Sequence, residues 1–329
     1  MRALMLTHAE ACYGSNYLWN GLNIVLGEGN VYDYSEKPGY HGKPHNNVDI
    51  PEQNIFNGSV SITPWMPAYK EHGIDTKGII FLLKNDFFDF IVVESGRLHA
   101  MRRWDEIKDY RGRAKVILHD GEDFSTPNTD AIQSIKPDVY LKRELLKSFP
   151  NGFTENGMLV LPFPFSCPDQ LVPTTDRTEF DYNVCFCCGN TYPLRGEMAL
   201  ALHELPGVFV ANNGGTNFID LLPFFDYIEM LRRSRFGVSV RGFGWDTCRY
   251  WETAVNTGLI ADELGIHIPN PFQNGKNCLV YDNIECAVDI SQFVSVGHYS
   301  DIRQAGMTHA RKHHLNSARV KWLLEQITN

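Results

Sequence analysis

The sequence has little of several features that mark specialised classes of protein. No apolar run reaches roughly 18 residues, the minimum for a helix that crosses a membrane. Eight cysteines in 329 residues are too few for a disulfide scaffold. The amino end turns polar too early for a signal peptide, and residues 2–7 resemble a first strand. We therefore expect a cytoplasmic protein with reduced thiols.

Positive charge is also scarce. The net charge is −9 and the pI is near 5.7, which argues against a general nucleic-acid binder held by bulk electrostatics. The stretch from Arg97 to Lys115 departs from this balance, because basic residues outnumber acidic ones there. Its ordinary interpretation is a solvated helix face. The alternative is a contact with an acceptor that carries phosphate, DNA included.

Three closely spaced cysteines suggest a metal cluster at first sight. Strand alternation places Cys185 and Cys187 on one face and Cys188 on the other. No pair of histidines or cysteines at zinc spacing accompanies them. We interpret them as buried core thiols and predict no metal site.

Strands and helices alternate along both halves of the chain, which predicts parallel sheets covered on both faces. Residues 1–165 form a first α/β domain, and the proline-rich, polar residues 166–182 are expected to be a linker. Residues 183–312 form a second domain, and residues 313–329 a terminal helix that can pack back on the first. Within the tail, one helix is predicted over residues 302–326. Two Rossmann-like domains in series predict a ligand cleft between them.

The strongest chemical signal is the segment RFGVSVRGFGWDTCRYWETAVNTG, which starts at Arg235. An apolar strand is followed by a glycine-rich turn and then by a helix with Asp246 as a candidate N-cap and Gly258 as a candidate stop. The unpaired N–H groups of a helix N-terminus attract phosphate. Arg241 and Arg249 can add charge-assisted hydrogen bonds, and Glu252 can accept bonds from a ribose. The ordinary alternative is a helix cap and a surface ion pair.

A second turn has the same character. Gly189, Asn190 and Thr191 join a strand to a helix, so they can hold a phosphate or form an ordinary tight turn.

The stretch IEMLRRSRFGVSVRGFGWDTCRYWETAVNTGLIA resembles the donor-site segment of GT-B glycosyltransferases, in particular the group 1-like or CgeB-type and exostosin-type transferases. The resemblance covers residues 180–329 well and the first half only in architecture. It implies two Rossmann-like domains with parallel sheets that face each other across a cleft. It also implies transfer of a hexosyl or pentosyl group from a nucleotide-sugar, a UDP-sugar by expectation, to a hydroxyl group. The second half shows no D-x-D pattern at a strand end, so we expect no metal or other cofactor.

The same resemblance assigns roles to residues of the second half. Glu252 would bind the ribose. The diphosphate and nucleotide would be held by the following residues: Gly189, Asn190, Thr191, Arg195, Arg241, Gly242, Asp246, Thr247 and Arg249. Phe243 and Gly244 would face the sugar or the acceptor. Many retaining relatives carry a second glutamate at the position of Gly244, so the stereochemistry does not carry over.

The catalytic base is expected from the first half, at strand ends. The candidates are Asp120 and His8, and Glu94 ends another apolar strand. Glu122 is a possible acceptor contact, and Gly14 and Ser15 would let a loop approach the phosphates. The sequence does not decide the acceptor, which can be a glycan, a lipid-linked or small molecule, or a hydroxymethylated base in DNA. The alternatives to transfer are a nucleotide-sugar epimerase of the same fold and a non-catalytic nucleotide-sugar-binding protein.

Overall fold

The computed structural model describes residues 1–8, 12–34, 37–41, 64–94, 98–149, 154–155, 157–212, 221–294 and 299–328. The chain divides into two compact units. Unit 1 comprises Met1–Pro164 and Asn316–Asn329, and unit 2 comprises Phe165–Leu315. The polar residues 35–57 are expected from their sequence to form a loop, and most of them lie outside the described residues.

Unit 1 is built on a seven-stranded sheet in the order β2-β1-β3-β4-β5-β7-β6. All neighbouring pairs are parallel except β6 with β7. The strands are β1 (Ala3–Leu6), β2 (Val31–Tyr34), β3 (Phe90–Glu94), β4 (Lys115–Asp120), β5 (Val139–Lys142), β6 (Thr154–Glu155) and β7 (Met158–Pro162). The helices are α1 (Tyr13–Leu26), α2 (Thr76–Lys84), α3 (Leu98–Ile107), α4 (Thr129–Ile135) and α10 (Asn316–Thr328).

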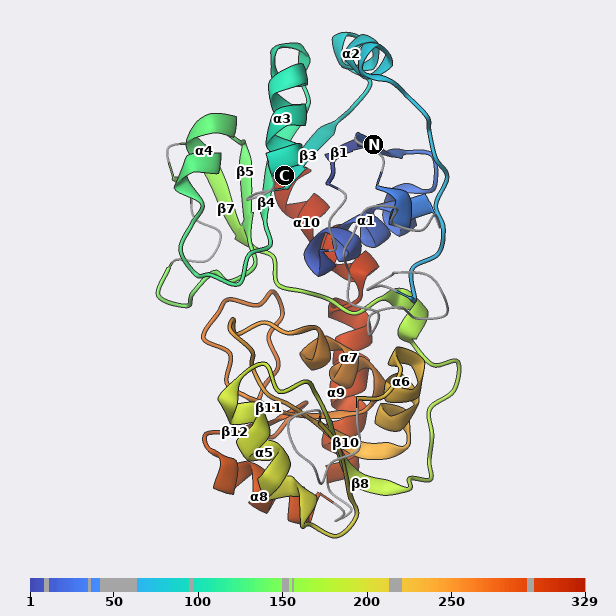
Figure 1. Cartoon of the computed structure of the whole chain (residues 1–329), viewed down its shortest axis with the longest axis vertical. Helices are drawn as coiled ribbons and strands as arrows, with labels where there is room; N and C mark the ends of the chain where they lie inside the picture. Colours follow the sequence, from blue (N-terminus) through green and yellow to red (C-terminus); the bar gives the residue numbers. More distant parts are fainter. Residues whose placement is uncertain are drawn as a thin grey trace. The chain divides into compact units, whose positions relative to one another are not determined.

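The sheet of unit 1 separates two cores because alternate side chains of a strand point to opposite faces. In β1, Leu4 and Leu6 join one cluster, whereas Ala3 and Met5 join the other. Both faces are therefore buried, as is usual for parallel sheets. Helix α10 packs against α1 on the second face (Figure 1).

Unit 2 contains a five-stranded parallel sheet in the order β12-β11-β10-β8-β9. Its strands are β8 (Tyr182–Cys187), β9 (Val208–Ala211), β10 (Ser234–Ser239), β11 (Gly258–Asp262) and β12 (Leu279–Tyr281). Its helices are α5 (Pro193–His203), α6 (Phe224–Arg232), α7 (Cys248–Asn256), α8 (Ile284–Phe293) and α9 (Tyr299–His313). Both units are thus Rossmann-like, with helices between parallel strands.

Several expected elements differ from the structure. The single helix predicted over residues 302–326 is wrong, since it breaks between α9 and α10. At the break the His314 carbonyl accepts the Cys167 backbone N–H at 2.8 Å, and His314 is fully buried against Phe272. Residues 166–182, expected as a linker, lie in unit 2 and contribute the buried side chains of Cys167 and Leu171.

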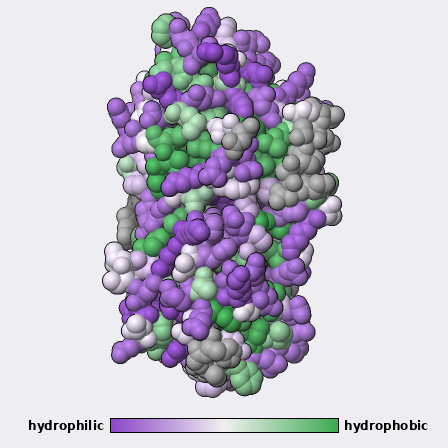
Figure 2. Space-filling view, turned by 180° about the vertical axis from the view of Figure 1, so that it is seen from behind, coloured by the Kyte–Doolittle hydropathy of each residue, from purple (hydrophilic) through white to green (hydrophobic). Residues whose placement is uncertain are grey.

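Polar side chains cover most of the outer surface. Figure 2 shows a face on which hydrophilic residues predominate and hydrophobic ones form separate small groups. Cys185, Cys187 and Cys188 are buried free thiols. None of the described helices combines the length and hydrophobicity that a membrane crossing requires.

Candidate functional site

The carboxyl ends of β8 and β10 bring the two predicted phosphate turns together in unit 2. These strands are parallel neighbours, so the turn at Gly189 and the turn at Arg241 emerge at the same edge of the sheet. Open α/β sheets bind ligands at this edge. The helices that follow, α5 and α7, both begin there. The nucleotide-binding residues predicted from the sequence therefore lie in one region.

Arg195 forms hydrogen bonds with both turns, the one at Gly189–Thr191 and the one at Arg241. It is 5 % exposed, and its Nε donates to the Arg241 carbonyl at 3.1 Å. Its terminal nitrogens donate to Thr191 Oγ1 at 2.8 Å and to the Val240 carbonyl at 3.2 Å. A side chain added at Gly242 would come within 3.2 Å of this guanidinium, which explains the small residue there. Arg195 thus positions the turns with donors that we had expected to hold a diphosphate.

Arg241 lies in an aromatic setting that the sequence did not predict. Its guanidinium lies over the Trp245 ring, 4.4 Å from the centroid, and more distantly over Tyr192. Its Nε is 3.8 Å from a carboxylate oxygen of Asp262, at the end of β11. Burial raises the pKa of Asp262 to about 6. The sequence signal that could have indicated Asp262 is its place as an acidic residue directly at the end of an apolar strand.

Asp246 does not cap the helix, which corrects the sequence prediction. The N-cap of α7 is Thr247, whose side chain makes no capping bond. Asp246 is 4 % exposed and accepts hydrogen bonds from the Trp251 indole N–H at 2.7 Å and the Phe165 backbone N–H at 2.5 Å. Its carboxylate therefore ties the start of α7 to the segment that enters unit 2.

Arg249 and Glu252 lie in the first turns of α7. Arg249 Nε donates to the Cys187 carbonyl at 2.9 Å. Its two terminal nitrogens have no hydrogen-bond partner within the described part of the chain. Glu252 is 4 % exposed, and burial raises its pKa to about 7 against the opposing effects of Arg249 and of the Tyr227 hydroxyl. A cation with open donors thus lies near a carboxyl group that titrates close to neutrality.

The titration of Glu252 predicts a pH effect on stability. The unfolded chain releases this proton near pH 4.5, whereas the folded chain keeps it to about pH 7. The folded state binds more protons in this window, so the free energy of unfolding falls as pH rises through it, by about 1–3 kcal/mol. Urea denaturation between pH 5 and 8 should show a smaller fall for Glu252→Gln than for wild type. Parallel curves for the two proteins would contradict the assignment.

Glycine at position 258, next to α7, allows a neighbouring side chain to pack closely against the backbone. Gly258 does not take the left-handed conformation expected of a helix stop. Instead, a side chain there would come within 2.4 Å of the Phe236 ring. In the turn before α7, Gly244 is buried and Phe243 is 83 % exposed. Phe243 is therefore available to a ligand, and Gly244 is not.

The carboxyl edge of the unit 1 sheet carries a buried imidazole–carboxylate pair. His8 Nε2 lies 2.5 Å from Glu94 Oε2, and both residues are at most 2 % exposed. Burial lowers the pKa of His8, but contacts with Cys12 and Glu94 outweigh it, so its pKa is raised overall. Burial raises the pKa of Glu94, and contacts with His8 and Lys37 reverse this.

Residues at the start of α1 contribute to the same cluster. Gly14 and Ser15 are buried in the first turn of this helix. The Ser15 hydroxyl favours ionisation of both Glu94 and Cys12. Burial raises the pKa of the Cys12 thiol, but the contacts with His8, Lys37 and Ser15 together outweigh it, so the pKa is lowered overall. Sequence inspection singled out His8 and Glu94 separately, and their pairing across β1 and β3 required the fold.

Asp120, the other candidate base, has several partners. Its carboxylate is 3.1 Å from Lys142 Nζ and accepts hydrogen bonds from the Tyr140 hydroxyl and the Glu122 backbone N–H. Asp120 and Lys142 are the last residues of β4 and β5, Tyr140 lies within β5, and Glu122 follows β4. These donors already occupy the oxygens of the carboxylate, so few lone pairs are left for an acceptor hydroxyl. Glu122 itself is half-buried in the following turn.

The basic stretch near α3 carries mostly paired charges. Arg97 lies outside the described residues. Within the stretch, ion pairs join Arg103 to Glu106, Lys108 to Asp105, Arg111 to Asp138 and Arg113 to Asp86. Lys115 donates to the Ile327 carbonyl. These contacts favour the interpretation as a solvated helix face.

Neither a known protein family nor a curated protein sequence matches this chain. Solved structures are similar in fold over nearly the whole chain. The trehalose-6-phosphate synthase OtsA has a TM-score of 0.57 at 11% identity, with 100% of this chain and 99% of that chain covered. Sucrose-phosphate synthase from Thermosynechococcus elongatus has a TM-score of 0.52 at 9% identity, with 100% and 99% covered.

A third similar structure is named as an epimerase and not as a synthase. A protein assigned as a UDP-N-acetylglucosamine 2-epimerase, from Listeria monocytogenes, has a TM-score of 0.50 at 11% identity, with 99% and 95% covered. These likenesses show the fold class, two Rossmann-like domains of the GT-B type. The narrower resemblance to CgeB-type and exostosin-type transferases stays a prediction.

Proposed function

We propose that this protein transfers a glycosyl group from a nucleotide-sugar to an acceptor hydroxyl. The observation that carries the proposal is the carboxyl edge of the unit 2 sheet. There the open terminal nitrogens of Arg249 lie on the first turn of α7, beside two turns that Arg195 holds together. Similar structures include an alpha,alpha-trehalose-phosphate synthase from Burkholderia vietnamiensis that is described as UDP-forming. A UDP-sugar is therefore the donor that we propose.

The donor would be bound by charge and by hydrogen bonds to its ribose. The N–H groups at the start of α7, together with Arg249 and Arg241, would hold the diphosphate. Glu252, near the Tyr227 hydroxyl, would accept bonds from the ribose hydroxyls when ionised. The same cations would stabilise the negative charge that develops on the diphosphate as the glycosidic bond breaks. These fixed charges support a mechanism that needs no metal ion.

The acceptor would be activated by His8. A general base must be able to take a proton and be held in one orientation, and Glu94 provides that orientation at 2.5 Å. The partners of Asp120 argue for a structural role instead. The paired charges around α3 favour a sugar or small-molecule acceptor over DNA.

The decisive test is a thermal-shift panel of nucleotides and nucleotide-sugars with wild type and Glu252→Ala. We expect one nucleotide family to stabilise the wild type. Loss of the ribose contact should weaken that binding about 10- to 100-fold in the variant. Asp289→Ala, an exposed acidic residue on α8, is the control and should bind like wild type. Equal stabilisation of all three proteins would contradict the role of Glu252.

The alternatives give different products. Without an acceptor, an epimerase of this fold would convert the nucleotide-sugar to its epimer, or release free nucleotide if water takes the sugar, whereas a binding protein would leave the nucleotide-sugar unchanged. Incubation of the wild type with the stabilising nucleotide-sugar alone, followed by chromatography, separates these outcomes. Transfer predicts rapid release of nucleotide only when an acceptor is added.

A further inference from the structure

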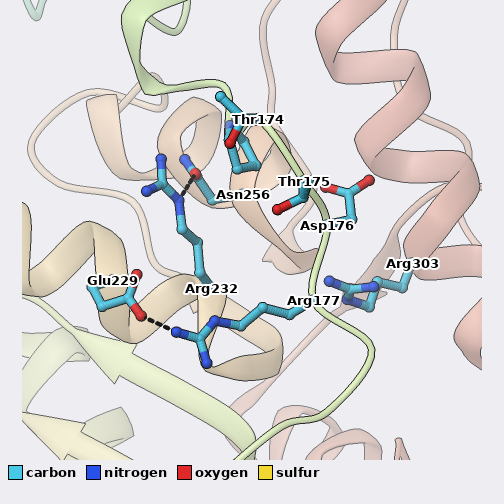
Figure 3. Close-up of a pocket in the computed structure, with 9 residues that line it drawn as sticks. Thr174, Thr175, Asp176, Arg177, Glu229, Arg232, Asn256 and Arg303 are labelled. Atoms are coloured by element: carbon cyan, nitrogen blue, oxygen red, sulfur yellow. Dashed lines mark hydrogen bonds and ion pairs between the residues drawn. The ribbon is translucent and has the colours of Figure 1, made fainter.

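A pocket of about 230 Å³ lies at the opposite edge of the unit 2 sheet (Figure 3). It is formed where α6 and α7 end, directly before β10 and β11 begin. The loop that carries Thr174–Arg177 and the first turns of α9 complete it. The pocket is therefore separate from the turns at the carboxyl edge, which hold Arg241 and Arg249.

Both carboxylates of this pocket already have arginine partners. Glu229 on α6 pairs with Arg177 of the loop, as Figure 3 shows. Asp176 accepts two hydrogen bonds from the terminal nitrogens of Arg311, at 3.0 and 2.7 Å. The negative charges of the lining are thus largely neutralised by these two cations.

Two further guanidinium groups face the pocket without a carboxylate of their own. Arg232 donates to Asn256 Oδ1 at 3.0 Å and to the Leu171 carbonyl at 2.9 Å, which are neutral acceptors. Arg303 reaches in from α9, is 7 % exposed, and has no hydrogen-bond partner at Nε. It lies over the Phe180 ring, 4.5 Å from the centroid. Neither arginine forms an ion pair with any other residue that the structure describes.

Burial of a cation without an anion is costly. Burial lowers the pKa of both Arg232 and Arg303, and it outweighs the opposite influence of Glu229 on Arg232 and of Asp176 on Arg303. The carbonyl groups at the ends of α6 and α7 offset part of this cost, since helix C-termini favour cations by about 0.3–1 kcal/mol. A charge-assisted hydrogen bond contributes more, about 1.5–3 kcal/mol. An anion in the pocket would therefore stabilise these arginines beyond what the helix ends provide.

We propose that this pocket binds the phosphate group of a small phosphorylated molecule, at a site separate from the nucleotide-sugar site. Arg232 and Arg303 would supply the charge-assisted bonds, and the adjacent Thr174 and Thr175 hydroxyls would supply neutral ones. The volume of about 230 Å³ matches about eight water molecules at roughly 30 Å³ each. It therefore accommodates a phosphate group and a few attached atoms. This proposal does not depend on the identity of the donor.

The test is a titration with inorganic phosphate, followed by thermal unfolding, against sodium chloride at equal ionic strength. We expect phosphate to raise the Tm of the wild type. Arg232→Gln, and Arg303→Lys as the variant that keeps charge in the buried position, should each weaken phosphate binding about ten-fold or more. Arg233→Gln is the matched control, because Arg233 is the neighbouring arginine but pairs with Asp181 outside the pocket.

Phosphate bound at the carboxyl edge would give a different pattern. Arg249→Gln should keep the phosphate-induced rise in Tm if the pocket is the site. Loss of that rise in Arg249→Gln, together with its retention in Arg232→Gln and Arg303→Lys, would overturn the proposal. A wild type that phosphate does not stabilise would overturn it as well. Neither result bears on nucleotide-sugar transfer, which the Glu252→Ala panel tests separately.

Discussion

Replacing His8 by alanine should lower the rate of glycosyl transfer by about 10²- to 10⁴-fold, the usual contribution of a general base. The imidazole is held 2.5 Å from Glu94 and is buried at the carboxyl edge of the first sheet. Nucleotide binding should be unchanged, because the proposed donor residues all lie in unit 2. The measurement is kcat with the acceptor in excess, alongside the nucleotide Kd.

The matched control is His41→Ala. His41 also contacts a carboxylate, with Nε2 at 3.1 Å from Asp33, in the same unit. We expect this variant to keep kcat within a few-fold of wild type. Asp120→Asn tests the alternative that Asp120 is the general base. If it loses more activity than His8→Ala and still folds, the base is Asp120.

Replacing Asp246 by alanine should destabilise the protein by about 3–5 kcal/mol. The change leaves two buried donors unsatisfied, the indole N–H of Trp251 and the backbone N–H of Phe165, each at a cost of about 1–3 kcal/mol. It also leaves a cavity beside Trp251, which is fully buried. The measurement is the free energy of unfolding from urea denaturation.

Two comparisons separate this effect from a general loss of charge. Asp246→Asn keeps one acceptor oxygen and should fall between wild type and Asp246→Ala. Asp289→Ala removes an exposed carboxylate and should change the stability by at most about 0.5 kcal/mol. If Asp246→Ala is as stable as Asp289→Ala, the hydrogen bonds of Asp246 do not hold the start of α7.

Periodicity and strand-end reasoning predicted much of the architecture. The sequence pattern predicts helices over residues 76–84 and 284–293, and α2 and α8 have these bounds. The break between α9 and α10 was missed because the helical sequence pattern continues through it. At the break, the His314 carbonyl accepts a hydrogen bond from the backbone N–H of the distant Cys167. The short α4 and β12 were missed because elements of this length carry too little pattern.

Part of the candidate site could be singled out from the sequence. Parallel strands present their following residues at one edge, which indicated His8, Glu94 and Asp120. Glu252 lies on α7 and was indicated by its place on that helix and by the family resemblance. The sequence could not show that Lys142 pairs with Asp120. Nor could it show that Asp246 and Arg195 form hydrogen bonds with other residues of the protein, because these contacts join distant segments.

The placement of α10 has a consequence for biosynthesis. This helix completes the interior of unit 1, where Val320 and Leu323 pack among residues of α1 and β1. Unit 2 is therefore inserted between two parts of unit 1 in the chain. During translation the first sheet is made early but is completed only after α10 has been made, whereas unit 2 has all its residues sooner. We expect a nascent chain released before α10 to contain a folded second unit and an incomplete first one.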